Sequence, residues 1–281
     1  MSGTKIPINH YIYPYIGQVK GMPVYLAGIG GTEYQGRINR PEGYCWHQIL
    51  YCEKGCGTLK YDGVTVRITP GCYFFLPAYY PHEYYPDEKK WDVRWLVFEG
   101  KGCKEILSEL GMTKPFTVNF ENANVLHRLY RDIFIALKTD KIFGNYTCAG
   151  LVYQYIMEFY RLTLDSSPNG GGYSDVLLPA LNYIDEHLLE DFSISALAEY
   201  VGVSQQYLGR VFRQTMNLRP NEYVTTRRLH EAERLLVETN LSSAQIAKEC
   251  SFSDAGYFCT VFKRYEKMTP TEYRNKHCSR G

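Results

Sequence analysis

The sequence carries almost no excess charge and no long apolar run. Its 281 residues hold 31 Lys and Arg against 30 Asp and Glu, a formal net charge of +1. Bulk attraction to nucleic acid or membrane is therefore absent, and any polyanion site must come from local asymmetry. No stretch of about 18 apolar residues occurs, and residues 1–10 lack the apolar core of a signal peptide. We expect a cytoplasmic protein with no membrane partner.

The cysteines do not form a framework of pairs. Their count of nine is odd, and they are scattered from Cys45 to Cys278 in a chain without a signal peptide, which favours reduced thiols. Cys52 and Cys56 form a lone Cys-x-x-x-Cys pattern, which is too little to predict a metal site.

The length predicts two folded units, because one domain takes roughly 150 residues. Gly, Pro, Ser and Asn accumulate in residues 165–173, a composition typical of a linker. We therefore predict a first domain at 1–165, a linker at 166–173 and a second domain at 174–281.

The first domain is predicted to be mainly antiparallel β structure. Residues 24–99 alternate short β-branched or aromatic runs with turn signals such as Asp62-Gly63 and Pro70-Gly71, which indicates a barrel or sandwich. From Asn122 the apolar residues recur every four positions, so two amphipathic helices follow. Their stripes either pack on the β structure or form a dimer seam.

The second domain reads as helices and contains an internal repeat of about 50 residues. The recurring pairs are Leu197 with Ile246, Tyr207 with Tyr257, Val211 with Val261, Phe212 with Phe262, Pro220 with Pro270 and Tyr223 with Tyr273. Only two copies are present, so a duplicated small module is favoured over a solenoid.

Each copy has the anatomy of a helix-turn-helix. In the first copy Gly202 suits a tight turn, and Ser204 caps a second helix over about 205–215. In the second copy Asp254 starts the corresponding helix, while Ser251 stands at the place of Gly202. A glycine turn is therefore not predicted for both copies.

Positive charge begins where the first of these second helices begins. Residues 173–209 contain no Lys or Arg, whereas residues 204–281 hold 13 basic against 8 acidic residues. A solvated helix face is the simpler explanation of such a run, but here charge, caps and repeat coincide twice, which predicts DNA binding. The side chains expected to meet phosphates, with salt-sensitive affinity, are Arg210, Arg213, Arg227, Arg228, Lys263, Arg264 and Lys267.

The C-terminal hundred residues resemble the DNA-binding domain of the AraC/XylS family of bacterial transcription regulators. The resemblance lies in residues 197–204, 207–213, 255–264 and 269–273. It implies seven helices, with a connecting helix at about 221–238 holding two recognition helices. Such helices enter successive major grooves about 34 Å apart.

Four side chains are the candidates for reading base edges. Gln205, Gln206 and Arg210 lie on the first recognition helix, where Gln bonds adenine and Arg bonds guanine; Gly209 leaves a reading position of the family blank. Small residues dominate the second helix, so Thr260 is its one candidate. Backbone phosphates are assigned to Arg213, Lys263 and Arg264.

Residues 40–98 resemble the cupin-type effector domain of the same family, through Arg40 to Gly43, Pro81 to Tyr84 and Trp91 to Phe98. The resemblance implies a β-barrel around a small molecule. A metal cupin would need a second His beside His47; Glu53 and His82 are too loosely placed to complete a set. We therefore predict no metal, no cofactor and no enzyme, with a metal-dependent cupin enzyme as an alternative.

Five residues are the candidates for effector binding. Arg40, Tyr84 and Trp95 match positions where an arabinose-responsive member of the family holds its sugar, and His47 and His82 are expected on strands near the same cavity. Aromatic faces flanked by polar donors suit a sugar. Core packing of these Trp and His residues is the alternative, and Val93 stands where that member has a His.

Together these features predict an α+β protein in two parts, a cupin-like antiparallel β-barrel with two helices and an all-α double helix-turn-helix. We expect a homodimeric transcription regulator of carbohydrate-use genes that binds double-stranded DNA, a sugar and RNA polymerase. The segment from Thr4 to Gln18 and the linker are expected to change with sugar. An aromatic acid, a metal or an oxidant acting on the cysteines is the alternative effector, and activation and repression both stay open.

Overall fold

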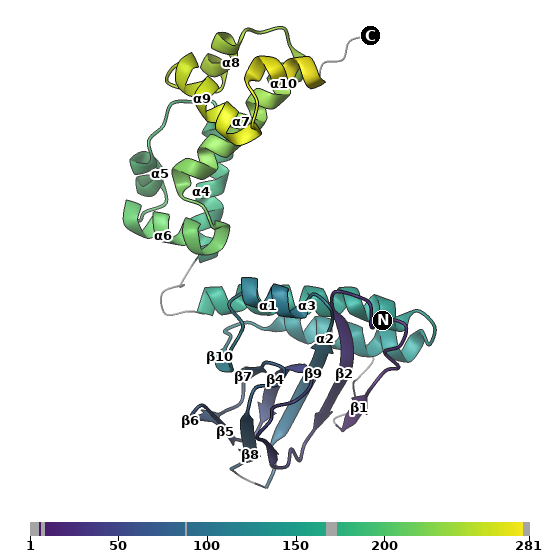
Figure 1. Cartoon of the computed structure of the whole chain (residues 1–281). Helices are drawn as coiled ribbons and strands as arrows, with labels where there is room; N and C mark the ends of the chain where they lie inside the picture. Colours follow the sequence, from purple (N-terminus) through teal and green to yellow (C-terminus); the bar gives the residue numbers. More distant parts are fainter. Residues whose placement is uncertain (1–5, 7–8, 88, 167–172, 278–281) are drawn as a thin grey trace. The chain divides into compact units, whose positions relative to one another are not determined.

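The chain forms two compact units, Met1–Pro168 and Asn169–Gly281. The computed structural model describes residues 6, 9–87, 89–166 and 173–277 (Figure 1). Most of the predicted linker, and Thr4 of the predicted arm, lie outside these residues. In the described part no helix combines the length and apolar character needed to cross a membrane.

The first unit contains two antiparallel sheets. The larger has, in spatial order, β1 (His10–Ile12), β2 (Tyr25–Thr32), β9 (Asp92–Glu99), β4 (His47–Lys54), β7 (Cys72–Leu76) and β10 (Phe116–Asn119). The smaller has β3 (Ile38–Arg40), β8 (His82–Pro86), β5 (Gly57–Tyr61) and β6 (Val64–Ile68). All neighbouring strands are antiparallel, as predicted.

The two sheets pack face to face around an apolar core. Both contribute fully buried side chains, among them Leu50 and Phe74 from the larger sheet and Leu59 and Ile68 from the smaller. Trp91 is completely buried here, and its Nε1–H points to the Cys52 sulfur at 3.3 Å. This tryptophan is therefore a core residue.

Helices cover the opposite face of the larger sheet (Figure 1). The short α1 (Cys103–Glu109) is followed by α2 (Asn124–Thr139) and α3 (Gly144–Ser166). The predicted stripe of α2 is buried against α3 and the sheet. Packing on the β structure is thus confirmed as one role of this stripe.

The second unit is all helical. Its elements are α4 (Tyr173–His187), α5 (Ile194–Tyr200), α6 (Gln205–Met216), α7 (Pro220–Glu238), α8 (Ser243–Glu249), α9 (Ala255–Glu266) and α10 (Pro270–His277). These seven described helices match the predicted number. We call the part built on α4, α5 and α6 the first module, and that built on α8, α9 and α10 the second module; α7 joins them.

Local sequence explains where the recognition helices start. The Ser204 hydroxyl accepts the Tyr207 N–H at 3.2 Å, and the Asp254 carboxylate accepts the Tyr257 N–H at 2.7 Å. These contacts satisfy N–H groups that have no partner within the helix. α6 and α9 therefore begin where the caps predict.

Candidate DNA-binding surface and effector pocket

The first recognition helix, α6, presents all of its candidate residues to solvent. Gln205, Gln206, Arg210 and Arg213 are exposed, whereas the opposite side of the helix buries Leu208, Val211 and Phe212. The Arg210 guanidinium carbon lies 4.9 Å from the Tyr207 ring centroid, a distance that fits a cation–π contact. The four polar side chains are thus free to meet a duplex.

Gly209 sits among these residues without a steric reason to be glycine. A Cβ atom built at Gly209 has no heavy atom within 4 Å. Its backbone is ordinary helix, because residue 209 lies inside α6. The blank reading position is therefore open space on the helix surface.

The second recognition helix, α9, separates its candidates. Thr260 and Lys263 are exposed, and the Thr260 hydroxyl donates to the Gly256 carbonyl at 2.9 Å. The hydroxyl oxygen can still accept a bond from a base. Arg264 lines a groove with Asn221 and Thr225 of α7, so it lies toward α7, at the flank of the surface that Thr260 and Lys263 occupy.

Three basic residues expected to meet phosphates make ion pairs or hydrogen bonds with other parts of the same chain. Arg227 pairs with Asp185 at 2.9 Å, and Lys267 Nζ donates to the Arg264 carbonyl at 2.8 Å. Arg228 donates to three backbone carbonyls. These bonds occupy three of the five guanidinium N–H groups, so contact of Arg228 with phosphate stays a prediction.

A cavity of about 200 Å³ in the first unit brings together three of the predicted effector residues. Its lining is aromatic and polar: Tyr13, Gln35, Ile38, Arg40, Tyr44, Gln48, Tyr84, Trp95 and Val97. Arg40 Nη1 donates to Gln48 Oε1 at 2.6 Å, and its guanidinium carbon lies 3.8 Å from the Tyr44 ring centroid. The cavity thus combines flat apolar faces with fixed hydrogen-bonding groups.

His82 lies behind one wall of this cavity. Its ring stacks parallel to Tyr84, with centroids 6.0 Å apart, and its Nδ1–H donates to the Tyr80 carbonyl at 2.7 Å. The pKa of His82 is lowered overall. Burial is the largest cause, nearby Arg40 also lowers the pKa, and the bond to Tyr80 partly opposes them. His82 Nε2 is buried without a hydrogen-bond partner among the described residues, so a neutral His82 offers a spare acceptor.

His47 does not join the cavity. Successive residues of a strand point to opposite faces; on β4, Gln48 lines the cavity, and His47 lies on the helix-covered side. There its ring stacks with Phe75 and Phe98, and Nδ1 accepts the Ala78 N–H at 3.0 Å. Burial lowers the pKa of His47 to about 4, so it is neutral at pH 7. The expected grouping of His47 with Arg40 is therefore corrected.

The three candidate metal ligands do not converge on one site. His47 lies on the helix-covered side of the larger sheet, while His82 belongs to the smaller sheet. The Glu53 carboxylate is paired with Arg94 at 3.0 Å. In the part of the chain that the structure describes, no three His, Cys, Asp or Glu side chains converge on one point.

The N-terminal segment supplies a cavity residue that the sequence did not single out. β1 pairs with β2, and Tyr13 then lies across Gly28, where a Cβ atom would come within 2.7 Å of the tyrosine ring. Beyond Tyr13 the segment is bonded to α3, because Asn145 Nδ2 donates to the Tyr15 carbonyl at 2.8 Å. One short segment therefore contacts both the cavity and α3.

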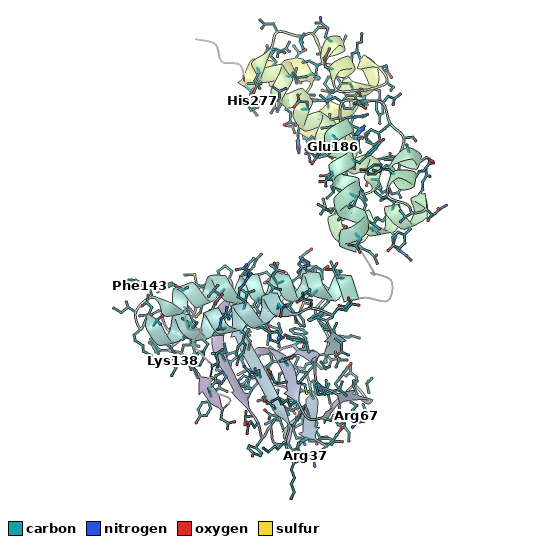
Figure 2. The ribbon with its side chains drawn as sticks, turned by 180° about the vertical axis from the view of Figure 1, so that it is seen from behind. Arg37, Arg67, Lys138, Phe143, Glu186 and His277 are labelled. Carbon is teal, nitrogen blue, oxygen red and sulfur yellow. The ribbon has the colours of Figure 1, made fainter. Side chains whose placement is uncertain are left out.

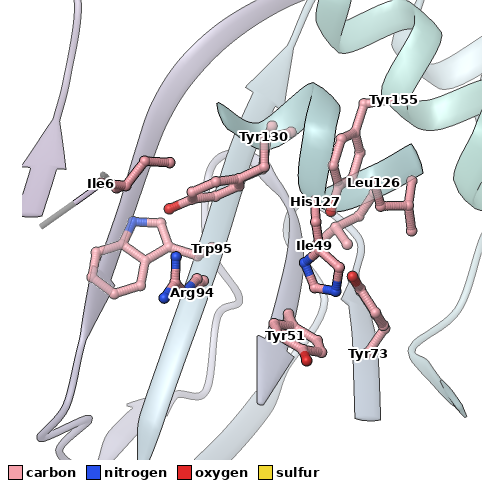
Figure 3. A pocket seen from close by; sticks show the side chains of 11 residues that line it. Ile6, Ile49, Tyr51, Tyr73, Arg94, Trp95, Leu126, His127, Tyr130 and Tyr155 are labelled. Carbon is pink, nitrogen blue, oxygen red and sulfur yellow. The ribbon is translucent and has the colours of Figure 1, made fainter. Parts of the chain in front are cut away.

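A second cavity, of about 70 Å³, involves both the larger sheet and the helices (Figure 3). Tyr51, Tyr73, His127, Tyr130 and Tyr155 surround it. Burial raises the pKa of each of these tyrosines and lowers that of His127.

Trp95 borders both cavities. A Cβ atom at position 30, which is glycine, would come within 2.4 Å of the Trp95 ring. The Trp95 indole can therefore occupy this position only because residue 30 has no side chain.

Comparison with known proteins agrees with this two-part arrangement. The model of the AraC-like ligand binding domain matches residues 24–154, and the model of a helix-turn-helix domain matches residues 197–276. The arabinose operon regulatory protein of Escherichia coli (strain K12) is 24% identical over 265 residues, which cover 89% of this chain and 88% of that protein.

Two further relatives also match over most of their length. The raffinose operon transcriptional regulatory protein RafR of Pediococcus pentosaceus is 26% identical over 270 residues, which cover 92% of each chain. The lactose operon transcription activator of Staphylococcus xylosus is 21% identical over 228 residues, which cover 79% of this chain and 81% of that protein.

A ligand-binding domain followed by a double helix-turn-helix defines a DNA-binding transcription regulator with a small-molecule effector. This chain belongs to the AraC family of such regulators. The family is one of transcription regulators and not of enzymes.

Proposed function

We propose that a carbohydrate of about monosaccharide size, bound in the cavity of Arg40, Tyr84 and Trp95, controls how this regulator acts on its promoters. The observation that carries the proposal is the lining of that cavity, in which aromatic faces stand beside a guanidinium and an amide. A sugar presents apolar C–H faces to the rings and hydroxyls to the polar groups.

The size of the cavity favours a single ring. Pockets for drug-sized ligands have volumes of about 300–1,000 Å³, and an apolar cavity of about 150 Å³ holds benzene. At about 200 Å³, the cavity suits one sugar unit better than an oligosaccharide.

The names of the three relatives refer to arabinose, raffinose and lactose operons, which supports a sugar as the class of effector. Val93, which stands where an arabinose-responsive member of the family has a His, is completely buried in the core between the sheets. An apolar side chain there offers no hydrogen bond, so we do not assign arabinose in particular.

The N-terminal segment is the element that we expect to respond. A ligand shifts only an equilibrium between states that it binds unequally. Tyr13 lines the cavity, and its neighbours are bonded to α3 through Asn145 and Tyr146. A sugar that contacts Tyr13 therefore stabilises one position of the segment against α3.

The pair of helices α2 and α3 is our candidate for the dimer contact. Ile142 and Phe143, at the turn between α2 and α3, are 65% and 62% exposed, and Figure 2 shows Phe143 at this end of the pair. Exposed apolar side chains at one place indicate a contact surface.

On DNA, we assign base edges to Gln205, Gln206, Arg210 and Thr260, and phosphates to Arg213, Lys263 and Arg264.

Thermal unfolding with a panel of sugars tests the effector. All three tryptophans lie in the first unit, so their fluorescence reports the unfolding of that unit alone. A ligand at a hundred times its Kd adds about 2.7 kcal/mol of stability. We expect one monosaccharide to raise the midpoint, and Trp95→Phe to remove the rise while sugar-free DNA binding is kept.

The two buried strand histidines provide a matched control. Because the His82 ring stacks on the cavity residue Tyr84, His82→Gln is expected to weaken sugar binding about fivefold through Tyr84, whereas His47→Gln is expected to leave it unchanged. A response to an aromatic acid, a metal salt or an oxidant in place of every sugar would refute the carbohydrate assignment.

A further inference from the structure

One arginine of α7 binds backbone from both modules at once. Arg228 Nε donates to the Leu188 carbonyl at 2.9 Å, and Nη2 donates to the Glu190 carbonyl at 2.6 Å. Both carbonyls belong to the segment between α4 and α5, in the first module. Nη1 donates to the Ser251 carbonyl at 2.8 Å, in the turn between α8 and α9 of the second module.

The surroundings and shape of the Arg228 guanidinium suit it to bind three backbone carbonyls. Arg228 is half-buried, and its guanidinium carbon lies 5.7 Å from the Phe192 ring centroid, within the range of a cation–π contact. Three carbonyls in different directions match the planar fork of an arginine, whereas a lysine ammonium is a compact point charge on a flexible stem.

Ser251 provides a second bond between the same two segments. Its backbone is left-handed, with φ of 53°, a conformation that side chains disfavour and glycine accepts. Gly202 has φ of 71° at the corresponding turn of the first module. The Ser251 hydroxyl donates to the Leu189 carbonyl, so serine supplies a bond that glycine lacks.

Apolar packing does not make these two modules one body. The core of the first module includes Val224 of α7 and the core of the second includes Leu229, but no buried residue belongs to both. A groove of about 500 Å³ opens beside Arg228 and Ser251. Besides the continuous helix α7, these hydrogen bonds connect the two modules directly.

We propose that Arg228 is a positioning residue which, together with Ser251, fixes the angle between the two modules and thereby the spacing at which both recognition helices enter DNA. The inference rests on the part of the proposed function in which α6 and α9 read the same duplex. Rigidly connected reading helices tolerate only one separation of their half-sites, close to one helical turn. A loosened pair accepts neighbouring separations.

Binding to duplexes of altered spacing tests this role. The full chain first selects its preferred duplex from a library of about 30 random base pairs, a length of roughly three turns. One base pair is then inserted or deleted between the two half-sites. For the wild type we expect affinity to fall about tenfold on either change. For Arg228→Gln we expect weaker binding to the selected duplex and a fall of less than about threefold on either change.

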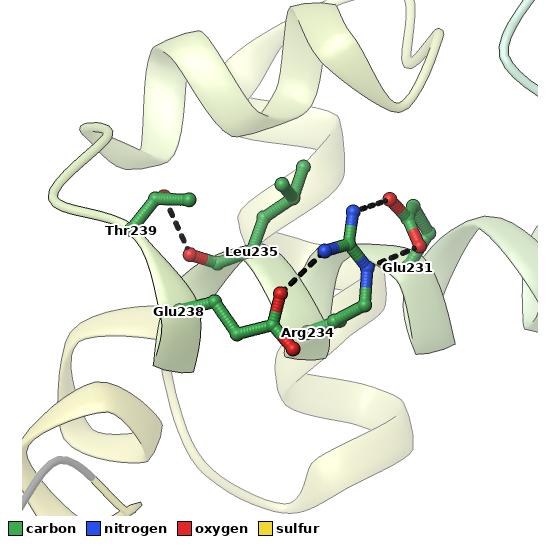
Figure 4. A network of polar contacts seen from close by, with 5 residues as sticks. All are labelled: Glu231, Arg234, Leu235, Glu238 and Thr239. Carbon is green, nitrogen blue, oxygen red and sulfur yellow. Dashed lines mark hydrogen bonds and ion pairs between the residues drawn. The ribbon is translucent and has the colours of Figure 1, made fainter.

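Arg234 is the matched control on the same helix. Among the residues that the structure describes, its guanidinium bonds only Glu231 and Glu238, each about one turn away on α7 (Figure 4). Arg234→Gln removes the same charge without touching the contact between modules. It is expected to keep the wild-type penalty for altered spacing.

Two further variants keep the test decisive if Arg228→Gln does not fold. Arg228→Lys keeps the charge but not the three bonds, and Ser251→Gly keeps the left-handed backbone but loses the hydroxyl. Both are expected to reduce the spacing penalty. Wild-type penalties in every folded variant, or a wild type that binds all spacings equally, would overturn the inference.

Hydrogen exchange on the DNA-free full chain separates this inference from the proposed function. Amides of residues 188–192 and 250–253 are expected to exchange faster in Arg228→Gln than in Arg234→Gln. The wild type can select no duplex while this difference in exchange is still seen. In that case the proposal that α6 and α9 read the same duplex fails, and the connection between the modules through Arg228 stands. Equal exchange in the two variants means that Arg228 does not hold the modules.

Discussion

Glu233 makes the stability of the second module depend on pH in an unusual direction. The residue lies on α7, and its carboxyl faces Glu266, the last residue of α9. Burial, the charge of Glu266 and a hydrogen bond to Glu266 together raise the pKa of Glu233 to about 7. Its Oε1 is buried without a hydrogen-bond partner among the described residues.

The sign of the effect follows from the two protonation states. In the unfolded chain the carboxyl has its ordinary pKa of about 4.5, so above that pH the folded state holds a proton that the unfolded state has lost. Stability is fully present below about pH 4.5 and is lost as the pH rises through about 7. A pKa change of this size corresponds to roughly 3 kcal/mol; because the side chain is half-exposed, solvent screening reduces our expectation to about 1 kcal/mol.

Glu233→Gln replaces the carboxyl by an amide that does not ionise, so the variant should not lose stability as the pH rises. We expect the variant to match the wild type at about pH 5 and to exceed it by about 1 kcal/mol at about pH 8. Urea unfolding followed by far-ultraviolet circular dichroism reports the helices of both units, so a change in it that tryptophan fluorescence does not share belongs to the second unit. Tryptophan fluorescence reports the first unit and should not change, since all three tryptophans lie there.

Glu231→Gln is the control, because a hydrogen bond from Arg234 lowers the pKa of Glu231. This variant is expected to gain no stability as the pH rises. A difference between Glu233→Gln and the wild type that is the same at both pH values would refute the reasoning.

Two other substitutions probe the surfaces directly. Arg210→Ala is expected to lose about 1–3 kcal/mol of discrimination at one base pair, measured by competition among singly substituted duplexes; an equal loss for all sequences would make Arg210 a phosphate contact. Gly30→Ala would place a Cβ atom within 2.4 Å of the Trp95 ring, so the indole must move. Sugar affinity should fall while sugar-free DNA binding stays unchanged, and an unaltered sugar affinity would remove Trp95 from the pocket.

Local signals in the sequence were enough to place the helices of the second unit. Ser204 and Asp254 cap α6 and α9, and the predicted connecting helix at 221–238 is observed as α7, Pro220–Glu238. Caps and apolar spacing act within a few residues of chain, which is why they can be read directly. The left-handed turn at Ser251 was not predicted, because it depends on a hydroxyl that reaches Leu189, 62 residues away.

The effector cavity was only partly predictable. Arg40, Tyr84 and Trp95 line it as expected, whereas Tyr13, Tyr44 and Gln48 also do so without having been singled out. Strict alternation along β4 would have favoured Gln48 over His47, since neighbouring strand residues face opposite sides. Tyr13 could not be found this way, because its place depends on how the N-terminal segment crosses β2.

The empty space at Gly209 bears on how readily this regulator could acquire new targets in evolution. A Cβ atom can be added at that point of α6 without meeting any heavy atom within 4 Å. Replacement of a mid-helix glycine by alanine also favours the helix by about 1 kcal/mol. If α6 reads bases as we propose, a single codon change there is expected to alter which promoters the protein distinguishes, with its architecture left intact.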